Sequence, residues 1–455
     1  MSETRSPRRW RGALAVALAV ALASTACSGA GGGSSGDGDG TAITVLMVGN
    51  PQMEDLAKVT ADNFTKQTGI TVRFTILPEN ELRDKVTQDV ATQGGQYDVA
   101  TIGAYEAPIW AQNDWLHELS SYADADTGYD KGDLLEPMVA SLSGADGKLY
   151  AAPFYGESSF LMYNKELFAA KGITMPERPT WQQVAQFAAE LDDDSAGVSG
   201  ICLRGLPGWG ELFAPLTTVV NTFGGTWFEK DWTPKVNAPE FVEATKFYVD
   251  LLREHGQPGA PQAGFTECLN TFGQGKAAMW YDATSAAGTL EDANSSTVAG
   301  KVGYAYAPVN KTESSGWLWA WALAMPKTTK NADAAWKFIS WATGKEYEKL
   351  IGSSLGWSRV PAGKRQSTYQ IAEYRDSATA FADITLKSIQ EADPVNPGAQ
   401  PRPALGVQFV GIPEFADLGT KVSQEVSAAI AGQITVDKAL ADGQRLAEDV
   451  ASKHR

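Results

Sequence analysis

Strands and helices alternate along the chain after residue 40, and this order constrains the fold more than any other feature of the sequence. Residues 43–48 form an apolar run, and residues 71–77 alternate apolar with polar side chains, so both segments are typical of strands. A third strand is expected at 98–103, and apolar side chains recur at helical spacing between the strands. Strands separated by helices predict an α/β fold built on a parallel or mixed sheet.

The loops that follow the first and third of these strands are polar or aromatic. Asn50 lies in the first loop, and Tyr105 and Glu106 lie in the other. Because ligands of such sheets bind beyond the carboxyl ends of the strands, these three residues are candidates for contact with a ligand.

Residues 1–26 have the pattern of an export signal. A short arginine-rich stretch precedes the apolar run 12–23, which is shorter than the roughly 20 residues that span a bilayer. Small residues lead directly into Cys27, an arrangement that resembles the bacterial lipobox, in which the cysteine becomes the lipidated N-terminus. Ser24 departs from the leucine preferred there, so an ordinary cleavable signal is the alternative. The composition of residues 27–40 predicts a flexible linker.

Charge and cysteine content restrict the partners and the chemistry. The net charge is −16, which argues against nucleic acid as a partner. Cys202 and Cys268 are an isolated pair in a chain with an export signal, which predicts one disulfide, with two buried free thiols as the alternative. The histidines number three and are scattered, so neither a transition-metal site nor a cofactor is expected.

Two enzyme motifs occur, and both are background matches. The segment 352–356 fits G-x-S-x-G, but the only histidine after it is His454, next to the last residue. The glycines of 273–275 precede a strand-like run, whereas a dinucleotide fingerprint follows one. A secreted glycoside hydrolase with two catalytic carboxylates stays the alternative function, because such pairs have no local spacing signature. A surface adhesin or regulatory protein is a third hypothesis.

The later chain predicts two discontinuous lobes. Residues 148–168 have the pattern strand, strand, helix, and changes of lobe are expected near Pro153, Pro308 and Trp357. We therefore expect a first lobe at 41–152 with 309–356, and a second lobe at 153–308 with 357–455.

Several segments resemble the extracellular solute-binding proteins of sugar-type ABC importers. They are 148–168, 273–280, 322–326 and 334–339. Within that family, residues 201–211 and 280–285 look most like the branch that binds the polyols sorbitol and mannitol. The resemblance implies a two-lobed periplasmic-binding-protein-like fold with hinge strands and an interlobe cleft. It also implies a monomeric, lipid-anchored receptor on the extracellular face of the cell membrane, which delivers a sugar or polyol to a permease driven by an ATPase on another chain.

A polyol presents many hydroxyls and a thin apolar edge, so its site needs carboxylates, amides or arginine together with aromatic faces. Residues of these types occur in loop-like positions. The candidates for ligand binding are Asn50, Tyr105, Glu106, Tyr155, Glu157, Trp209, Glu211, Trp280, Asp282, Trp317, Trp319, Trp357 and Arg359.

Each candidate has a structural alternative. Any of the tryptophans can be core, and at least one of Trp317, Trp319 and Trp321 is expected to pack because all three share one side of a strand. Asp282 interrupts an apolar strand end, where it needs a partner, so it contacts the ligand or caps a helix. For Glu157 and Glu211 the alternative is surface charge, and for Arg359 it is an ion pair between the lobes.

Overall fold

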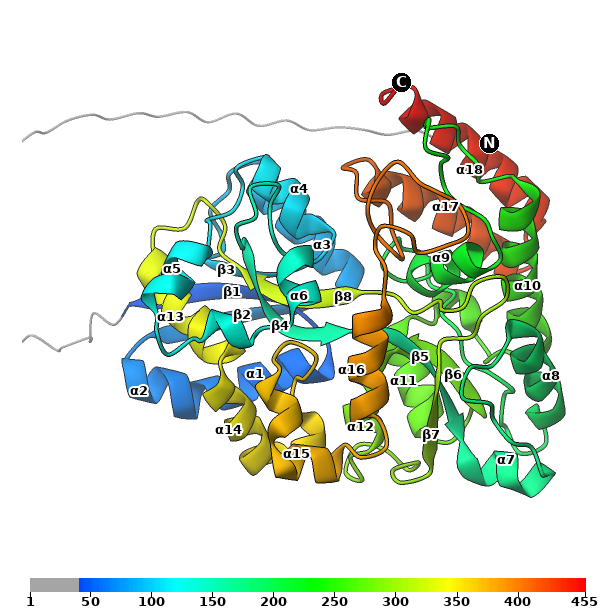
Figure 1. Cartoon of the computed structure of the whole chain (residues 1–455), viewed down its shortest axis with the longest axis horizontal. Coiled ribbons are helices and arrows are strands. Elements are labelled where there is room, and N and C mark those ends of the chain that lie inside the picture. The colour runs from blue at the N-terminus through cyan, green and yellow to red at the C-terminus, as the bar shows by residue number, and fades with distance from the viewer. Residues whose placement is uncertain (1–40) are drawn as a thin grey trace, which may run out of the picture. The chain divides into compact units, whose positions relative to one another are not determined.

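A computed structural model describes residues 41–455 (Figure 1). The predicted signal peptide, the proposed lipidation site Cys27 and the linker lie outside the described residues. No helix in the part of the chain that the structure describes is both long enough and apolar enough to cross a bilayer.

The first sheet has five strands, and it confirms the strands expected at 43–48, 71–77 and 98–103. They run in the order β2 (Thr71–Leu77), β1 (Ala42–Val48), β3 (Val99–Gly103), β8 (Trp319–Ala324) and β4 (Ala151–Glu157). β1 pairs in parallel with β2 and β3, whereas β8 is antiparallel to β3 and β4. The sheet is therefore mixed.

Local sequence explains where the first helix begins and ends. Asn50 caps α1, because its side chain accepts the Met53 N–H at 3.0 Å, and Pro51 occupies the first turn. Gly69 ends the helical stretch at a φ of 74°, a conformation that favours glycine. The helices of this lobe are α1 (Pro51–Thr60), α2 (Lys66–Thr68), α3 (Glu79–Ala91), α4 (Glu106–Gln112), α5 (Ser120–Ala125), α6 (Glu136–Ser141), α13 (Ala332–Thr343) and α14 (Lys345–Leu355).

The second sheet has three antiparallel strands in the order β6 (Met279–Ala283), β5 (Ser159–Asn164) and β7 (Val302–Tyr306). Thr180 and Gln183 form a capping box at the start of α8. The helices of this lobe are α7 (Lys165–Lys171), α8 (Trp181–Leu191), α9 (Phe213–Thr222), α10 (Pro239–His255), α11 (Phe265–Gly273), α12 (Ala287–Leu290), α17 (Phe415–Ile430) and α18 (Val436–Ala451). Two more helices, α15 (Ala372–Ser377) and α16 (Ala382–Glu391), precede α17.

The chain changes sheet within continuous extended segments. Ser158 alone separates β4 of the first sheet from β5 of the second. Because Glu157 pairs with Trp319 across the β4–β8 ladder, the returning segment crosses beside the outgoing one, at Leu318. The two lobes are therefore joined by adjacent strands.

These crossings differ from the positions expected from the sequence. Pro153 lies inside β4, next to a register shift, where its missing N–H is tolerated, so it does not mark the change of lobe. Val309 still bonds to the second lobe, through Pro179. Lys364 and Arg365, placed beyond the expected crossing at 357, pair with Glu348 and Asp133 of the first lobe.

Candidate functional site: a polar and aromatic cavity between the lobes

A cavity of about 400 Å³ lies between the lobes. In the first lobe it is lined by the loops after β1 and β2 and by the ends of β4 and β8, as expected for a sheet of this kind. The structure brings together these predicted residues in its lining: Asn50, Tyr155, Glu157, Trp209, Glu211, Trp317 and Trp319. The other predicted residues, Tyr105, Glu106, Trp280, Asp282, Trp357 and Arg359, do not line it.

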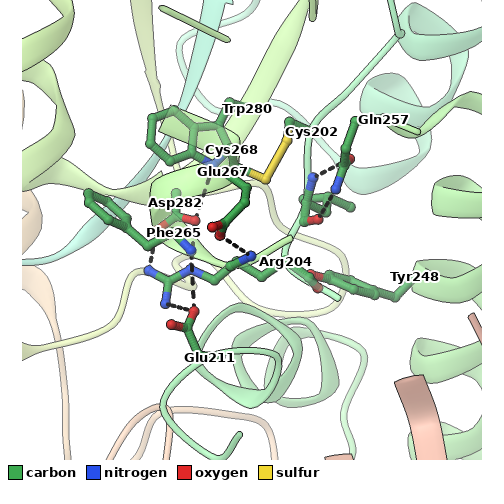
Figure 2. The surroundings of a disulfide bond; sticks show 12 residues. Cys202, Arg204, Glu211, Tyr248, Gln257, Phe265, Glu267, Cys268, Trp280 and Asp282 are labelled. Atoms are coloured by element: carbon green, nitrogen blue, oxygen red, sulfur yellow. Dashed lines mark hydrogen bonds and ion pairs between the residues drawn. A yellow bond between two sulfur atoms is a disulfide. The ribbon is translucent and has the colours of Figure 1, made fainter. Parts of the chain in front are cut away.

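Arg204 is the best-anchored side chain of the second-lobe wall (Figure 2). Its Nε and Nη2 donate to the two carboxylate oxygens of Asp282 at 2.8 and 2.5 Å, and its Nη1 donates to Gly210 O at 3.1 Å and to Glu211 at 3.3 Å. Burial acts against the charged form, but Asp282 and then Glu211 outweigh it and hold the pKa of Arg204 well above its ordinary value. The guanidinium is therefore charged and fixed in orientation.

Asp282 lies at the end of β6 and is fully buried behind Arg204. Besides Arg204 it accepts the indole Nε1–H of Trp280 at 3.1 Å and the Ala283 N–H at 2.7 Å. The sequence correctly required a partner for this carboxylate, but the structure supplies one from the chain, 78 residues away. Asp282 and Trp280 thus position Arg204 from behind the cavity wall.

The backbone that carries Arg204 is held on several sides. A disulfide joins Cys202 to Cys268 of α11, with the Cα atoms 5.7 Å apart (Figure 2). The Gln257 amide bonds to both the N–H and the carbonyl of Leu203, at 3.2 and 2.7 Å. The Tyr248 hydroxyl donates to the Arg204 carbonyl at 2.7 Å. This support fixes the place at which Arg204 enters the cavity wall.

Two lining carboxyls have raised pKa values. Burial raises the pKa of Glu157, at the end of β4, to about 8, although the Ser285 hydroxyl donates to its carboxylate at 2.5 Å. Burial, followed by the negative charge of Glu79, raises the pKa of Glu211 to about 8. Near pH 7 these groups therefore exist largely as acids, which donate as well as accept hydrogen bonds. Within 41–455 no group of three or more His, Cys, Asp or Glu side chains is arranged to hold a metal ion.

Arg83, which the sequence analysis missed, is the cation of the first-lobe wall. It bonds to Glu79, at 2.9 Å from Nη2, and to Glu106. Its guanidinium carbon lies 4.2 Å from the ring centroid of Trp209 and 5.1 Å from that of Trp319. The i,i+4 spacing of Glu79 and Arg83 is typical of an exposed helix face. This pattern therefore does not distinguish Arg83 from an ordinary surface arginine.

Tyr105 and Glu106 support this wall from behind. Glu106 pairs with Arg83 and accepts the Gly103 N–H at 2.9 Å. Tyr105 packs on Trp209 with the ring centroids 4.5 Å apart, and its hydroxyl donates to the Ile412 carbonyl at 2.8 Å. Both residues follow β3, as predicted. Their side chains, however, contact other protein groups and do not line the cavity.

Asn50 and Tyr155 form a hydrogen-bonded pair in the lining. While Asn50 Oδ1 caps α1, its Nδ2 donates to the Tyr155 hydroxyl at 3.0 Å. Burial raises the pKa of Tyr155 well above its ordinary value, so its hydroxyl keeps its proton. Gln52 Nε2 then links this side of the cavity to the second lobe, by donating to Ser285 O at 2.9 Å.

Arg359 and Trp357 lie outside the cavity lining. Arg359 pairs with Asp55 of α1 at 2.8 Å and with Asp292, which follows α12, at 2.9 Å. This arrangement matches the alternative of an ion pair between the lobes. Trp357 packs so closely on Gly352 of α14 that a Cβ there would lie 2.3 Å from its ring. An aromatic and an arginine beside a crossing therefore have a structural role here.

The lobes also touch on the far side of the cavity. Asn80 Nδ2 donates to Pro207 O at 3.0 Å. A Cβ on Gly210 would lie 2.2 Å from Glu79 Oε1 and 3.1 Å from Arg83 Nε, so any side chain at this position would have to displace Glu79. The structure is therefore a closed form.

Known proteins are similar to this chain in sequence and fold. A mannitol-binding protein of Pseudomonas aeruginosa is 42% identical over 404 residues, which are 89% of this chain and 91% of the relative. An ABC transporter solute-binding protein from Agrobacterium vitis, solved with D-mannitol bound, has a TM-score of 0.89 and 49% identity, covering 91% of this chain and 99% of that one. A solute-binding protein of Agrobacterium radiobacter in complex with ribitol has a TM-score of 0.80 and 25% identity, covering 90% and 99%.

The family model described as bacterial extracellular solute-binding protein matches residues 50–349. This match and the mannitol-binding relative confirm the resemblance seen in the sequence. The chain belongs to the bacterial extracellular solute-binding proteins.

Proposed function

We propose that this chain is the substrate-binding component of an ABC importer and that it captures a linear polyol, with a hexitol such as mannitol as the leading candidate. The observation that carries the proposal is the cavity wall in which Arg204, fixed by Asp282, lies beside Glu157 and Glu211. The ligands named for the relatives from Pseudomonas aeruginosa and Agrobacterium support the same choice. The volume of about 400 Å³ lies near the lower end of the range for small-molecule sites.

The lining suits hydroxyl groups because each hydroxyl both donates and accepts. Arg204 offers only donors, which bind hydroxyl oxygens, whereas Glu157 and Glu211 offer acceptors and, when protonated, donors as well. The indole faces of Trp209 and Trp319 suit the C–H edge of a polyol. A closed, polar and aromatic cavity of this kind matches both parts of such a ligand.

Charge pairing favours a neutral ligand over an acidic one. The only cations in the lining of the described structure are Arg83, paired with Glu79 and Glu106, and Arg204, paired with Asp282. An anionic sugar would therefore find no unpaired cation, and it would meet the carboxyls of Glu157 and Glu211. We expect sugar acids and sugar phosphates to be rejected.

Binding without chemical change is the second part of the proposal. Glu157 and Glu211 are two buried carboxyls in one cavity, which is also what a glycoside hydrolase needs. Both have raised pKa values, so neither is poised as the ionised base or nucleophile at neutral pH. The relatives described by their ligands are binding proteins, and this favours a receptor.

Isothermal titration calorimetry of the purified protein tests the ligand. We expect hexitols to bind more tightly than glucose or maltose, and mannitol 1-phosphate not to bind. The bound ligand, released by denaturation and analysed by chromatography, should be recovered unaltered. Failure of every polyol to bind would contradict the proposal, and a converted product would favour the hydrolase.

The family is extracellular, and attachment to the outer face of the membrane through a lipid on Cys27 is the remaining part of the proposal. It rests on the small residues before Cys27 and on the linker after it. The partners are then a membrane permease and its ATPase, and the receptor acts as a monomer. Cell fractionation of Cys27→Ala tests the anchor, because retention at the wild-type level would exclude it.

A further inference from the structure

The chain between α16 and α17 is a long irregular segment with a buried middle. Residues 392–414 contain no helix or strand in the described structure. Loops of this length without secondary structure are uncommon in compact domains and are usually either functional or disordered linkers. We call residues 393–413 the strap. Although its early part is mostly exposed, Val407, Gln408 and Val410 are only 3, 4 and 3% exposed.

The strap contacts both lobes around the cavity. Phe409 packs against Trp319 of β8, with ring centroids 5.9 Å apart, and against Trp209 of the second lobe at 6.2 Å. Asn221 of α9 anchors the strap from the second lobe, because its Nδ2 donates to Val407 O at 2.8 Å and its Oδ1 accepts from Arg402 at 2.7 Å. Gln408 lies between Val407, which Asn221 anchors, and Phe409, which packs on the two tryptophans, so its place in the strap is fixed.

Gln408 lines the cavity, and one end of its amide has a partner. Its Nε2 donates to the Leu318 carbonyl at 3.1 Å. Since a carbonyl accepts and does not donate, this bond fixes which end of the amide is Oε1. Oε1 is buried and has no hydrogen-bond partner among the described residues.

Trp317, which precedes Leu318 in the chain, contributes a hydrogen-bond donor that complements the Gln408 acceptor. Trp317 also lines the cavity, and its Nε1–H is buried without a partner in the described part of the chain. A buried acceptor or donor without a partner carries a free-energy cost. Hydroxyls satisfy both needs, because they donate to a carbonyl oxygen and accept from an indole N–H.

We propose that Gln408 is a ligand-binding and specificity-determining residue of the strap, whose Oε1 accepts a hydrogen bond from a hydroxyl of the bound polyol. The inference rests on the polyol-binding function proposed above and extends it to a segment that no strand or helix pattern marks. The Leu318 carbonyl orients the amide, and the Asn221 contact with the Val407 carbonyl holds the neighbouring backbone of the strap.

Titration calorimetry of Gln408→Met with mannitol tests the contact. Methionine keeps the length of the side chain but removes the acceptor, so we expect affinity to fall by roughly 2- to 12-fold, the range for one hydrogen bond. The matched control is Gln400→Met, an exposed glutamine of the same strap, which should retain wild-type affinity.

A comparison of ligands separates this contact from a general loosening of the strap. Polyols that lack one hydroxyl are titrated against wild type and Gln408→Met. For the hydroxyl that contacts Oε1, the deletion should weaken binding to wild type and have little further effect in the variant. If every deletion weakens binding to both proteins equally, Gln408 does not read a hydroxyl.

Two further measurements keep the outcome decisive. The unfolding temperature without ligand should be close for Gln408→Met and wild type. If Gln408→Met unfolds at a much lower temperature, Gln408→Glu is used in place of that variant. At about pH 5 a buried glutamic acid is protonated, so it keeps both the donor to Leu318 and an acceptor oxygen, and affinity should be retained. Wild-type affinity in Gln408→Met would overturn the inference while leaving the proposed function intact, whereas absence of polyol binding to wild type would remove both.

Discussion

The two walls of the cavity each contain a buried arginine held by carboxylates, but they differ in where the contacts come from. Arg204 bonds to Asp282, Gly210 and Glu211, all in the second lobe. Arg83 has its carboxylates in the first lobe, but the nearest aromatic face over which it lies, Trp209, belongs to the second. The second-lobe wall is therefore complete within one lobe, whereas the first-lobe wall is completed only when the lobes meet.

The difference between the two walls bears on how a ligand is captured. A wall that is complete within one lobe is pre-organised and has little ordering cost on binding. A wall completed by closure offers its contacts only in the closed form, towards which a bound ligand shifts the equilibrium. We therefore expect the second lobe to supply most of the polar affinity and the first lobe to supply the contacts that retain the ligand.

Arg204→Met should change stability and affinity more than any other substitution considered. Removal of the guanidinium leaves Asp282 buried without its cation, which costs about 3–5 kcal/mol of folding stability, and it abolishes measurable polyol binding. Arg83→Met is the matched variant. Its loss of folding stability should be smaller, because the Glu79 side chain that it leaves unpaired is 14% exposed and can be hydrated. Urea unfolding and titration calorimetry measure both quantities. Equal losses in the two variants would break the distinction between the walls.

The second effect is that of Asp282→Asn, which keeps the shape but removes the charge that fixes Arg204. Loss of charge-assisted hydrogen bonds of about 1.5–3 kcal/mol corresponds to roughly 10- to 150-fold in affinity. Glu106→Gln, the equivalent change behind Arg83, should cost less affinity. Wild-type binding by Asp282→Asn would show that the position of Arg204 does not depend on this carboxylate.

The third effect is a dependence of stability on pH. Glu157 and Glu211 have pKa values of about 8 in the fold against an ordinary 4.5, so between these values the folded state binds more protons than the unfolded state. Stability is therefore highest at the acid end of this window and falls as pH rises towards about 8, by at most about 1.4 kcal/mol per pH unit for each carboxyl.

Urea unfolding at pH 5, 6, 7 and 8 measures this slope without ligand. Glu157→Gln and Glu211→Gln should each flatten it, because an amide does not titrate. Glu166→Gln is the control, since the side chain of Glu166 is 64% exposed. An unchanged slope in both cavity variants would show that other groups cause the dependence.

The smallest effect is that of Gly210→Ala, which tests closure alone. The added methyl group meets Glu79 Oε1 in the closed form, and because that side chain has some freedom to move we expect a cost of about 1 kcal/mol, or roughly fivefold in affinity. Stability without ligand should match that of Gly132→Ala, whose Cβ would have its nearest neighbour at 3.7 Å. Unchanged affinity in Gly210→Ala would show that this contact does not limit closure.

Periodicity predicted the first sheet well because its strands obey local rules. β1 and β2 follow the apolar and alternating patterns of their segments, and Asn50 caps α1 directly after β1. The loops at the strand ends therefore pointed to the correct edge of the sheet. The family followed from segment resemblance, and the comparisons confirm it.

The side-chain contacts of the site could not be predicted in the same way. The sequence indicated that Asp282 needs a partner, but the choice between a ligand and Arg204 depends on a pairing across 78 residues. Arg83 looked like part of an exposed helix, and Gln408 lies in a strap without periodicity. Such residues are recognised only when the tertiary structure places their polar atoms against one cavity.

Ser158 and Leu318, where two of the segments that connect the lobes pass from one sheet to the other, have a mechanical consequence. If the angle between the sheets changes about this point, each atom is displaced in proportion to its distance from it, as on a lever. Glu157 and Trp319 lie at the fulcrum and hardly move, whereas Asn80 and Pro207, which meet on the far side of the cavity, lie on the long arms. A few degrees of rotation therefore open the mouth of the cavity while its base keeps its shape.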